Sequence, residues 1–512
     1  MAATRLKDEP RTVDRSAGDL RFLWGALALT TLLRLEGLLW PLKPDESGFL
    51  LVSRQWDATS DSLYGALFVD RPPILIGLFR LCDVVGGPYA PRVASGLLGL
   101  LFVYSAYRIG LLLGGTSSAR WTTAAAVALA GQPDLELWAG KSESLGMPLV
   151  LASCWLSLEA LTATRRNAAY ALAAGLTGAL AVGMKQNLGG GAVFGIVLLA
   201  VALGTHQLDR SRGLRLGSAA AAGFLVPVAG VVAWAAASGV ELHVLWDTLY
   251  GFRGDAFEVI TSSSADAPLS RLASLGVLFT TSGLAFLLVW FACCFATVRR
   301  SQAAAAAATA AMLLVDSVGL LLGGSYWTPY LTALLPGAVI AVALVVGQPS
   351  GRAPRGMRIV TGVAVASTVI TTIGWTAGHL LGRTAPDAHY VGTAVGAAAA
   401  PGDTIVVLYG RADIVLASGL DPVYEHLWSL PARTLDPELD GLRALLASNQ
   451  APTWVVEWNP VNSWEIDRDG RLQALLEQEY DVAAEVCGAQ VLLRRGEARD
   501  ALPSVDCDRA WR

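Results

Sequence analysis

The stretch LLWPLKPDESGFLLVSRQWDATSDSLYGALFVDRPP, residues 38–73, determines how the rest of this chain is interpreted. It begins where an apolar segment ends, and it contains an adjacent pair of acids, Asp45 and Glu46. It closes with another acid beside a base and two prolines, Asp70-Arg71-Pro72-Pro73. Most of the chain downstream consists of long apolar runs. We therefore expect any chemistry of this protein to lie between these two groups of charged residues.

The composition is that of a membrane protein. Of the 512 residues 54% are hydrophobic and 16% are charged, whereas a soluble domain usually carries about 25% charged residues. Apolar runs of about 20 residues, the length that crosses a bilayer core, recur along the chain. The sequence therefore predicts an α-helical polytopic membrane protein. Its net charge of −4 gives no support for a nucleic-acid partner.

The chain divides into three parts by composition. Residues 1–19 are charged and predict a cytoplasmic tail, residues 20–382 a transmembrane domain with a first outer loop at 41–91, and residues 383–512 a small α/β domain. Within the last part, strand and helix patterns occur at Thr404–Tyr409, Leu439–Ser448, Pro452–Trp458, Leu472–Tyr480 and Ala489–Arg494.

Hydropathy predicts about eleven crossings. Two further helices, Ser47–Trp56 and Ile74–Val85, are predicted to lie on the membrane surface within the first outer loop. The predicted crossings are Leu20–Trp40, Arg92–Leu113, Trp121–Trp138, Glu143–Leu161, Ala168–Met184, Leu188–Gly204, Leu216–Ser238, Leu272–Val298, Ala303–Leu322, Tyr330–Gly347 and Ile359–Leu381.

Basic residues gather in alternate loops on the same side as the basic N-terminus, which the positive-inside rule assigns to the cytoplasm. The C-terminal domain is then extracytoplasmic. On that same outer face lie loop 41–91, the turn Lys185–Asn187, the loop Gly239–Arg271 and the turn Gly323–Tyr326. Two of the six cysteines, Cys487 and Cys507, lie together outside the apolar region; whether they pair depends on this topology, and the sequence leaves it open.

The two charged groups have chemical interpretations and plainer alternatives. Neighbouring carboxylates such as Asp45 and Glu46 suit general-base catalysis because repulsion raises one pKa, but they also suit the first turn of a helix. A double proline presents Arg71 at a fixed angle, and arginine binds phosphate oxygens bidentately. The alternative for this motif is a rigid turn with a salt bridge.

The two motifs together resemble those of a known family. An Asp-Glu pair after the first membrane helix and an acid-base-Pro-Pro motif about 25 residues later are similar to the GT-C glycosyltransferases. The branch most similar contains the protein mannosyltransferases and the aminoarabinose transferase of lipid A. The resemblance implies a GT-C fold and transfer of a sugar from a polyprenyl-phosphate donor. The acceptor would be a cell-envelope glycan, lipid or protein, reached at the outer face of a bacterial plasma membrane.

Three later features agree with this resemblance. Glu143 opens a predicted crossing where the family often has an acid, and Lys185 resembles a family Lys-Gly-Pro signature, although Gln186-Asn187 replace Gly-Pro here. Tyr326 and Tyr330 lie where the family has phosphate-contacting tyrosines. Arg71 stands where lysine is common in the family.

The resemblance also implies roles. Asp45 would act as base or orient the acceptor hydroxyl, Glu46 would support it, and Asp70 would help to set the site. Arg71, with Lys185, Tyr326 and Tyr330, would bind the departing phosphate, and Glu143 would belong to the same phosphate-binding group. The anomeric carbon would invert. No cofactor or metal ligand set is predicted, and a divalent metal is left open.

Several residues and two other functions remain as alternatives. Arg92 fits an interfacial, snorkelling side chain better than a phosphate contact. The charged loop Gly239–Arg271, which includes Arg253, either closes over the acceptor or is plainly solvated. The same charges would also suit a non-catalytic lipid or sugar transporter, or a membrane scaffold that binds glycans. No internal repeat of the kind common in transporters is present.

Overall fold

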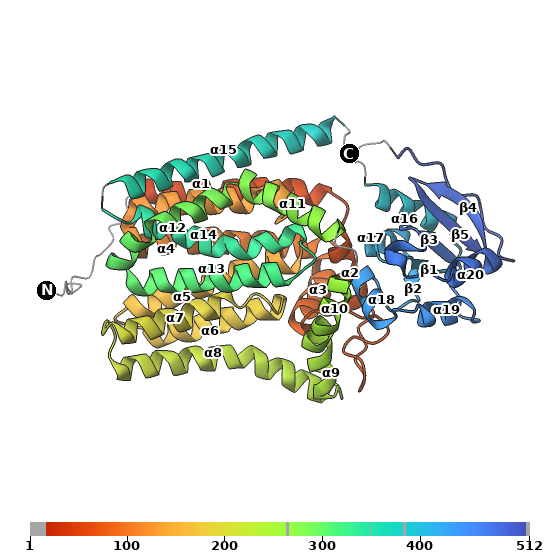
Figure 1. The fold of residues 1–512 in the computed structure, drawn as a ribbon, viewed down its shortest axis with the longest axis horizontal. Coiled ribbons are helices and arrows are strands. Elements are labelled where there is room, and N and C mark those ends of the chain that lie inside the picture. Colours follow the sequence, from red (N-terminus) through yellow and green to blue (C-terminus); the bar gives the residue numbers. More distant parts are fainter. Residues whose placement is uncertain (1–16, 263–265, 350, 382–385, 508–512) are drawn as a thin grey trace.

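A computed structural model describes residues 17–262, 266–349, 351–381 and 386–507. Residues 1–16 of the predicted tail and the predicted boundary at residues 382 and 383 lie outside this description. Long helices run side by side in one part of the molecule, and a smaller part with a β-sheet lies at one end of them (Figure 1). We call that end of the helix bundle the α/β end.

The long helices form a multi-pass membrane domain. In the part of the chain that the structure describes, nine helical segments are long and apolar enough to cross a bilayer. The bundle helices are α1 (Ala17–Leu35), α4 (Ala90–Gly131), α5 (Ser142–Thr162), α6 (Asn167–Met184), α7 (Gly190–Gly204), α8 (Arg210–Ala237), α11 (Asp266–Thr281), α12 (Leu284–Ser301), α13 (Ala303–Leu322), α14 (Leu335–Val346) and α15 (Arg352–Leu380).

Two glycines change the predicted crossings. Helix α4 contains two of them, because Gly115 (φ 71°) turns the chain back on itself and brings Gly110 against Ala119. The second ends at Gly131 rather than at Trp138, since Pro133 opens a separate turn. The predicted crossing Leu272–Val298 is interrupted at Gly283 (φ 82°), which separates α11 from α12. The count of eleven crossings stays a prediction.

Short helices connect the bundle helices at the α/β end. The two predicted surface helices exist as α2 (Pro44–Arg54) and α3 (Pro73–Gly86), but α2 is buried from Glu46 to Ser53. The expected loop 239–271 is largely helical. Its elements and the other short connections are η1 (Glu36–Leu39), η2 (Pro133–Leu135), α9 (Leu242–Trp246), the π-turn η3 (Asp247–Gly251), α10 (Phe252–Ser262) and η4 (Thr328–Leu334).

The C-terminal part is the predicted small α/β domain. Its five-stranded sheet has the order β2-β1-β3-β5-β4, with β1 parallel to β2 and β3, and β5 antiparallel to β3 and β4. Cys487 and Cys507 form a disulfide. The strands are β1 (Thr404–Val407), β2 (Asp421–Pro422), β3 (Trp454–Glu457), β4 (Tyr480–Val486) and β5 (Ala489–Arg494), and the helices are α16 (Asp387–Ala398), α17 (Ala412–Ser418), α18 (Ser429–Leu435), α19 (Asp440–Leu446) and α20 (Arg471–Glu479).

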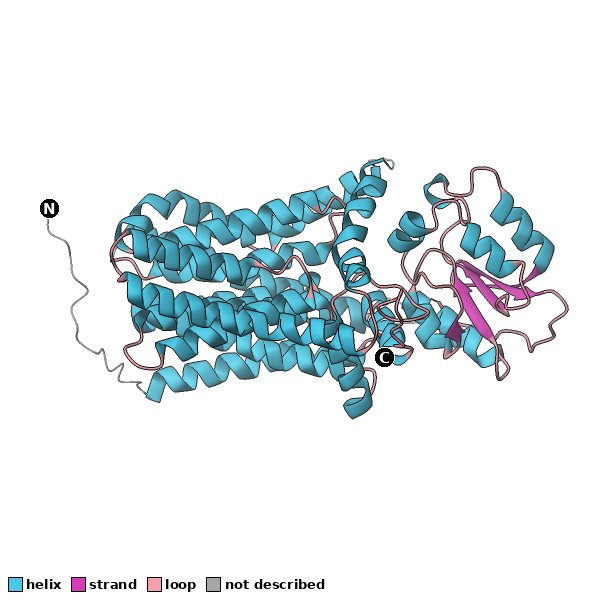
Figure 2. Ribbon diagram, turned by 90° about the horizontal axis from the view of Figure 1, so that it is seen from below, coloured by secondary structure: helices cyan, strands magenta, loops and turns pink. Residues whose placement is uncertain are grey.

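The two parts meet over α2. Helix α17 packs on α2, and α18 packs on α10. Gly48 of α2 makes room for the ring of Trp428, because a Cβ there would lie 2.3 Å from the indole. Phe68 forms an isolated bridge with His426. The sheet itself stands away from the bundle, and only helices and loops lie between them (Figure 2).

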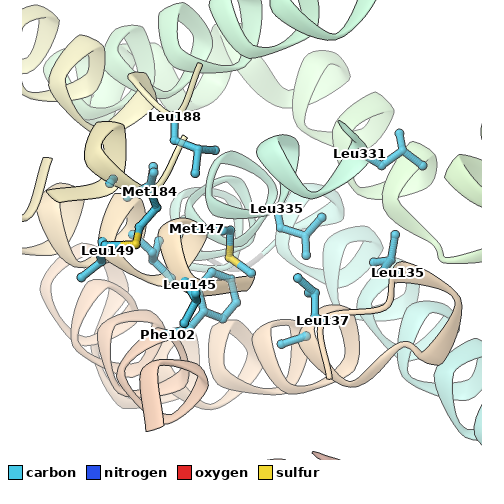
Figure 3. Packing of buried hydrophobic residues seen from close by; sticks show 14 of the residues in the cluster. Phe102, Leu135, Leu137, Leu145, Met147, Leu149, Met184, Leu188, Leu331 and Leu335 are labelled. Atoms are coloured by element: carbon cyan, nitrogen blue, oxygen red, sulfur yellow. The ribbon is translucent and has the colours of Figure 1, made fainter. Parts of the chain in front are cut away.

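A dry core lies next to the segments that carry the predicted site. Figure 3 shows Leu145 and Met147 of α5 with Phe102, Met184 and Leu335, all of them buried. All of these residues except Phe102 are close in sequence to Glu143, Lys185 or Tyr330. The polar groups at the α/β end are therefore anchored on rigid, close-packed helices.

Candidate active site

Asp45 lies in the first turn of α2. Lys43 is the N-cap, and Pro44 occupies the first helical position, where the missing N–H of proline has no cost. The Nε1 of Trp428 donates to Asp45 Oδ1 at 3.1 Å. The positive end of the helix favours the carboxylate. Asp45 is half-buried, so part of its side chain stays accessible.

Glu46 is buried and fully paired. Arg92 Nε donates to Oε1 at 2.7 Å and Arg92 Nη2 donates to Oε2 at 2.6 Å. The backbone N–H groups of Gly140 and Lys43 donate to the same carboxylate at 2.6 and 2.9 Å. Burial would raise the pKa of Glu46, but Arg92 and these N–H groups outweigh it and lower the pKa. Glu46 therefore fixes the start of α2 rather than facing a substrate.

The snorkelling interpretation of Arg92 is wrong. Arg92 is 3% exposed, and it also donates to the carbonyls of Trp40 and Pro41 at 2.7 and 2.8 Å and to that of Gly37. These bonds fasten the chain between α1 and α2. The side chain turns inward because a carboxylate and three free carbonyls lie there, which a lone basic residue in a sequence does not reveal.

Asp70 is the centre of a group of cations. Arg71 Nη1 donates to Asp70 Oδ1 at 2.6 Å, and Arg253 of α10 pairs with Asp70 Oδ2. Burial would raise the pKa of Asp70, but Arg253, Arg71 and Lys185 outweigh it and lower the pKa. Arg253 brings the loop that follows α8 into the site. Sequence reasoning named this loop without selecting Arg253, because its partner lies far away in the chain.

Arg71 lies between Asp45 and the rest of the group. The hydroxyl of Tyr64 donates to its backbone carbonyl, and the guanidinium lies over the ring of Phe49 at 5.9 Å. Burial would lower the pKa of Arg71, and the negative charges of Asp70, Asp45 and Glu143 raise it. Its Nε is buried without a hydrogen-bond partner among the described residues.

Lys185 and Glu143 form the other side of the group. They pair directly, and Ser142 Oγ donates to the second oxygen of Glu143 at 2.9 Å. The Nζ of Lys185 lies 4.8 Å from the ring centre of Tyr330. Gln186 donates to the carbonyls of Asp70 and Leu249 at 2.6 and 3.1 Å, so it ties this turn to two other loops. Sequence reasoning treated Gln186 only as a departure from a motif.

Two features differ from the expected set. Tyr326 lies in a strained turn (φ 51°), and its hydroxyl donates to the carbonyl of Leu321 at 3.3 Å rather than to a member of the group. Glu136, which was not selected, is held between Lys43 and Lys141, and the charge of Asp45 also acts on Lys141. Burial would raise the pKa of Glu136, but Lys141 and Lys43 lower it to about 2.

An apolar hollow of about 220 Å³ adjoins this group. Lys185, Gln186, Arg253 and Tyr330 line its polar end, and the other walls come from α10 and α13. The structure brings together Asp45, Asp70, Arg71, Glu143, Lys185 and Tyr330 of the predicted set. Across the described residues no cluster of three or more His, Cys, Asp or Glu side chains has the geometry of a metal site.

Neither a protein-family model nor a curated protein sequence matches the chain, but solved structures do. The aminoarabinose transferase ArnT from Cupriavidus metallidurans bound to undecaprenyl phosphate matches with a TM-score of 0.62 and 14% identity, covering 92% of this chain and 97% of ArnT. The apo state of the same protein matches with a TM-score of 0.64 and 15% identity, covering 93% of this chain and 98% of ArnT. A third match is the oligosaccharyltransferase AglB from Archaeoglobus fulgidus in complex with an inhibitory peptide and a dolichol-phosphate. Its TM-score is 0.52 and its identity 12%, and the match covers 94% of this chain and 75% of AglB. These likenesses show that the chain has the GT-C fold, as its motifs predict.

Proposed function

We propose that this chain is a membrane glycosyltransferase that moves a sugar from a polyprenyl-phosphate donor to a cell-envelope acceptor with inversion. One observation carries the proposal. An apolar hollow ends in Lys185 and Arg253, Arg71 shares Asp70 with Arg253, and the charge of Asp45 acts on Arg71. The likeness to ArnT, whose structure holds undecaprenyl phosphate, supports a lipid-linked donor.

The donor enters the hollow with its isoprenoid chain against Phe257, Ile260 and Leu322. Its phosphate meets three cations, Arg71, Lys185 and Arg253. Two of the acids that face these cations, Asp70 and Glu143, are already paired with them. A third acid, Asp45, also acts on Arg71, so the three acids and the three cations balance in charge, but Arg71 Nε has no hydrogen-bond partner among the described residues and is left for the phosphate. Arginine suits this task because its planar fork matches phosphate oxygens.

Asp45 accepts the proton of the acceptor hydroxyl while the hydroxyl oxygen forms a bond to the anomeric carbon. The bond between that carbon and the phosphate oxygen breaks, and its electron pair leaves with the polyprenyl phosphate. Negative charge thus gathers on the phosphate in the transition state, where cations fixed in advance lower the barrier. Attack opposite to the leaving group inverts the carbon.

The other acids act through their partners. Glu46 holds α2, and so Asp45, through Arg92. Asp70 orients Arg71 and Arg253, and Glu143 orients Lys185. Tyr330 places a ring against Lys185. We assign Tyr326 no contact with the phosphate.

The α/β end faces the outside in this proposal. Arg299 and Arg300 lie at the C-terminal end of α12, and Arg352 lies at the N-terminal end of α15. These helix ends are opposite the α/β end (Figure 1). The disulfide between Cys487 and Cys507 fits an oxidising compartment. Outside the cell a lipid-linked sugar takes the place of a nucleotide sugar, because nucleotide sugars are made and kept in the cytoplasm.

The test is a transfer assay with the purified full chain, using decaprenyl-phosphate mannose and decaprenyl-phosphate arabinose as donors. Lipid that copurifies is identified by mass spectrometry. Asp45→Asn keeps an oxygen for Trp428 but removes the base, so we expect a loss of about 10²- to 10⁴-fold in turnover with unchanged lipid binding. Full turnover in Asp45→Asn, or a copurified lipid without phosphate, would overturn the proposal.

A further inference from the structure

Two exposed tryptophans lie at the α/β end, one in each part of the molecule. Trp327 directly precedes η4 of the bundle and is 51% exposed. Trp464 belongs to the turn η5 (Ser463–Glu465) of the α/β domain and is 39% exposed. Neither lines the hollow at α10 and α13. Single exposed apolar side chains are common, but these two share a feature that sets them apart, a cation over the ring.

An arginine lies over each of the two rings. The guanidinium carbon of Arg271 in α11 is 4.0 Å from the ring centre of Trp327. That of Arg433 in α18 is 5.1 Å from the ring centre of Trp464. Stacking uses the flat face of a guanidinium, whereas its N–H groups point outward from the edge. We call Trp327, Arg271, Arg433 and Trp464 the strip.

The two arginines of the strip lie close enough to act on each other. Burial lowers the pKa of Arg433, and the like charge of Arg271 lowers it further. Arg271 forms no ion pair with a carboxylate among the described side chains, and its Nη1 donates to the carbonyl of Ser325 at 3.4 Å. Glu465 of η5 pairs with Arg468 at 2.8 Å instead. Like charges held together in this way favour an anion that reaches both of them.

A third arginine shows how the same stack looks when an acid completes it. Arg411 lies over the ring of Trp458 at 4.4 Å, and its Nε and Nη2 donate to Asp413 at 3.0 and 2.7 Å. The carboxylate there occupies the edge of the guanidinium that a ligand would need. The described side chains provide no such carboxylate for Arg271, so its edge stays open to an anion.

Both exposed rings are placed by strained turns. Trp464 and Glu465 have φ values of 58° and 56°, and Tyr326, directly before Trp327, has a φ of 51°. The left-handed region costs free energy for residues other than glycine, and such residues gather at functional sites. The ring of Tyr409 lies 5.7 Å from that of Trp464 and holds it edge-on.

The strip adjoins the candidate active site on two sides. Tyr330, which lies beside the cation group around Asp70, acts electrostatically on Arg271. Trp428, which donates to Asp45, is the N-cap of α18, and Arg433 lies about 8 Å further along that helix. Helix α18 packs on α10 where the two parts of the molecule meet (Figure 1). A chain molecule bound on the strip would therefore have an end near Asp45.

We propose that the strip binds an acidic glycan, with the anionic groups on Arg271 and Arg433 and the sugar rings against Trp327 and Trp464. Arginine recognises carboxylates and phosphates, and aromatic rings with a few placed polar groups are typical of sites for small polar molecules. A tryptophan can also anchor a protein at the membrane boundary. Trp464 does not suit that task, because it belongs to the α/β domain, whose sheet stands away from the bundle (Figure 2).

In the transferase this glycan is the part of the acceptor behind the reacting hydroxyl. That role rests on the proposed function, whereas binding of the glycan does not. The strip then selects acceptors whose sugar chain carries charge, since a neutral chain leaves two neighbouring arginines without an anion.

The test uses the full chain in phosphatidylcholine nanodiscs without donor, and calorimetry measures binding. The acidic probes are hexagalacturonate and pentamannose phosphate, which distinguish carboxylate from phosphate. Their neutral counterparts are the methyl ester of hexagalacturonate and pentamannose. We expect at least one acidic probe to bind at least tenfold more tightly than its neutral counterpart. Arg271→Gln and Arg433→Gln should each weaken its binding about tenfold. Arg471→Gln, which removes an exposed arginine paired with Asp469, should not.

A second pair of variants tests the strip if an arginine variant does not fold. Trp464→Glu places a negative charge beside the ligand and should abolish binding of the acidic probe. Val482→Glu adds the same charge at a 64% exposed position of β4 and should leave binding unchanged.

Equal binding of acidic and neutral probes, unchanged binding in all three strip variants, or competition by inorganic phosphate at equal concentration would overturn the inference. Asp45→Asn should bind the acidic probe as the unmodified chain does. Binding of the acidic probe in a chain that transfers no sugar would remove the proposed function and the acceptor role, and it would leave the glycan site in place.

Discussion

Two buried groups of charges lie a short distance apart at the α/β end, and they differ in how completely they are paired. In one, Glu46 has both oxygens bound by Arg92 and by two backbone N–H groups. In the other, Arg71, Arg253 and Lys185 share Asp70 and Glu143, and Arg71 Nε has no partner among the described residues. Lys185 and Arg253 of the second group line the apolar hollow of about 220 Å³, whereas Glu46 and Arg92 do not line it.

The comparison gives a way to separate structural charges from functional ones. A buried ion pair that satisfies every polar atom has nothing left to offer a ligand, and its removal exposes an uncompensated charge. A group with an unused hydrogen-bond donor beside an apolar hollow retains binding capacity. Three predictions test this division.

The largest effect is expected from the saturated pair. Glu46→Gln leaves the buried Arg92 without its counter-charge, so we expect a loss of about 3–5 kcal/mol in the free energy of unfolding. Thermal unfolding of the purified protein in nanodiscs measures this. The matched control is Asp83→Asn, which breaks the exposed pair with Arg54 and should cost about 1 kcal/mol or less.

A double variant, Glu46→Gln with Arg92→Met, should recover part of the loss because no lone charge remains. If Glu46→Gln left stability unchanged while it abolished donor binding, Glu46 would belong to the functional group instead.

An effect of intermediate size is expected in the group around Asp70, in which not every donor has a partner. Arg253→Gln removes one of three cations, while Asp70 keeps Arg71 as a partner. We expect about tenfold weaker binding of decaprenyl phosphate and little change in unfolding. Titration calorimetry measures the affinity, and Arg54→Gln serves as the control. A large loss of stability with unchanged affinity would place Arg253 among the structural charges.

The smallest effect concerns a saturated carboxylate in the α/β domain. Asp403 accepts from Arg499, from the indole of Trp454 and from the N–H of Ala400. The Arg499 hydrogen bond lowers its pKa to about 2 from the usual 3.8. Because the folded pKa is the lower one, Asp403 stabilises the domain above about pH 4, and this contribution is lost as the pH falls towards 2.

Near-UV circular dichroism of the full chain during thermal unfolding, repeated from pH 6 to pH 2, measures this dependence. Asp403→Asn should flatten the curve between pH 4 and pH 2. The same pH dependence in that variant would show that another group is responsible.

The sequence predicted much of this arrangement because its signals are local. Apolar runs predicted the bundle helices, alternating patterns predicted three strands, and the motifs at Asp45 and Asp70 predicted the position at which we propose the site. The apolar pattern of α2 is the same whether a membrane surface or the rest of the protein covers the helix. The sequence therefore did not reveal that α2 is buried. The glycines at 115 and 283 were visible, but a glycine within an apolar helix is common, so neither marked a break.

The rest depends on contacts between distant parts of the chain. Arg92 looked like a surface residue until Glu46 and three carbonyls surrounded it. Arg253 was one of several charges in a loop, and only the fold places it on Asp70. Trp428 lies 383 residues after Asp45, and nothing near either residue indicates their bond.

The bond from Trp428 to Asp45 bears on how the protein is made. Ribosomes release the amino end first, so α1, α2 and Asp45 are in place long before residue 428 is synthesised. Until the carboxyl-terminal module folds and docks, Asp45, the acid that we propose as the base, lacks this indole. If Asp45 acts as proposed, a nascent or truncated chain would hold its membrane helices and yet stay inactive, and the cell would gain activity only from completed molecules.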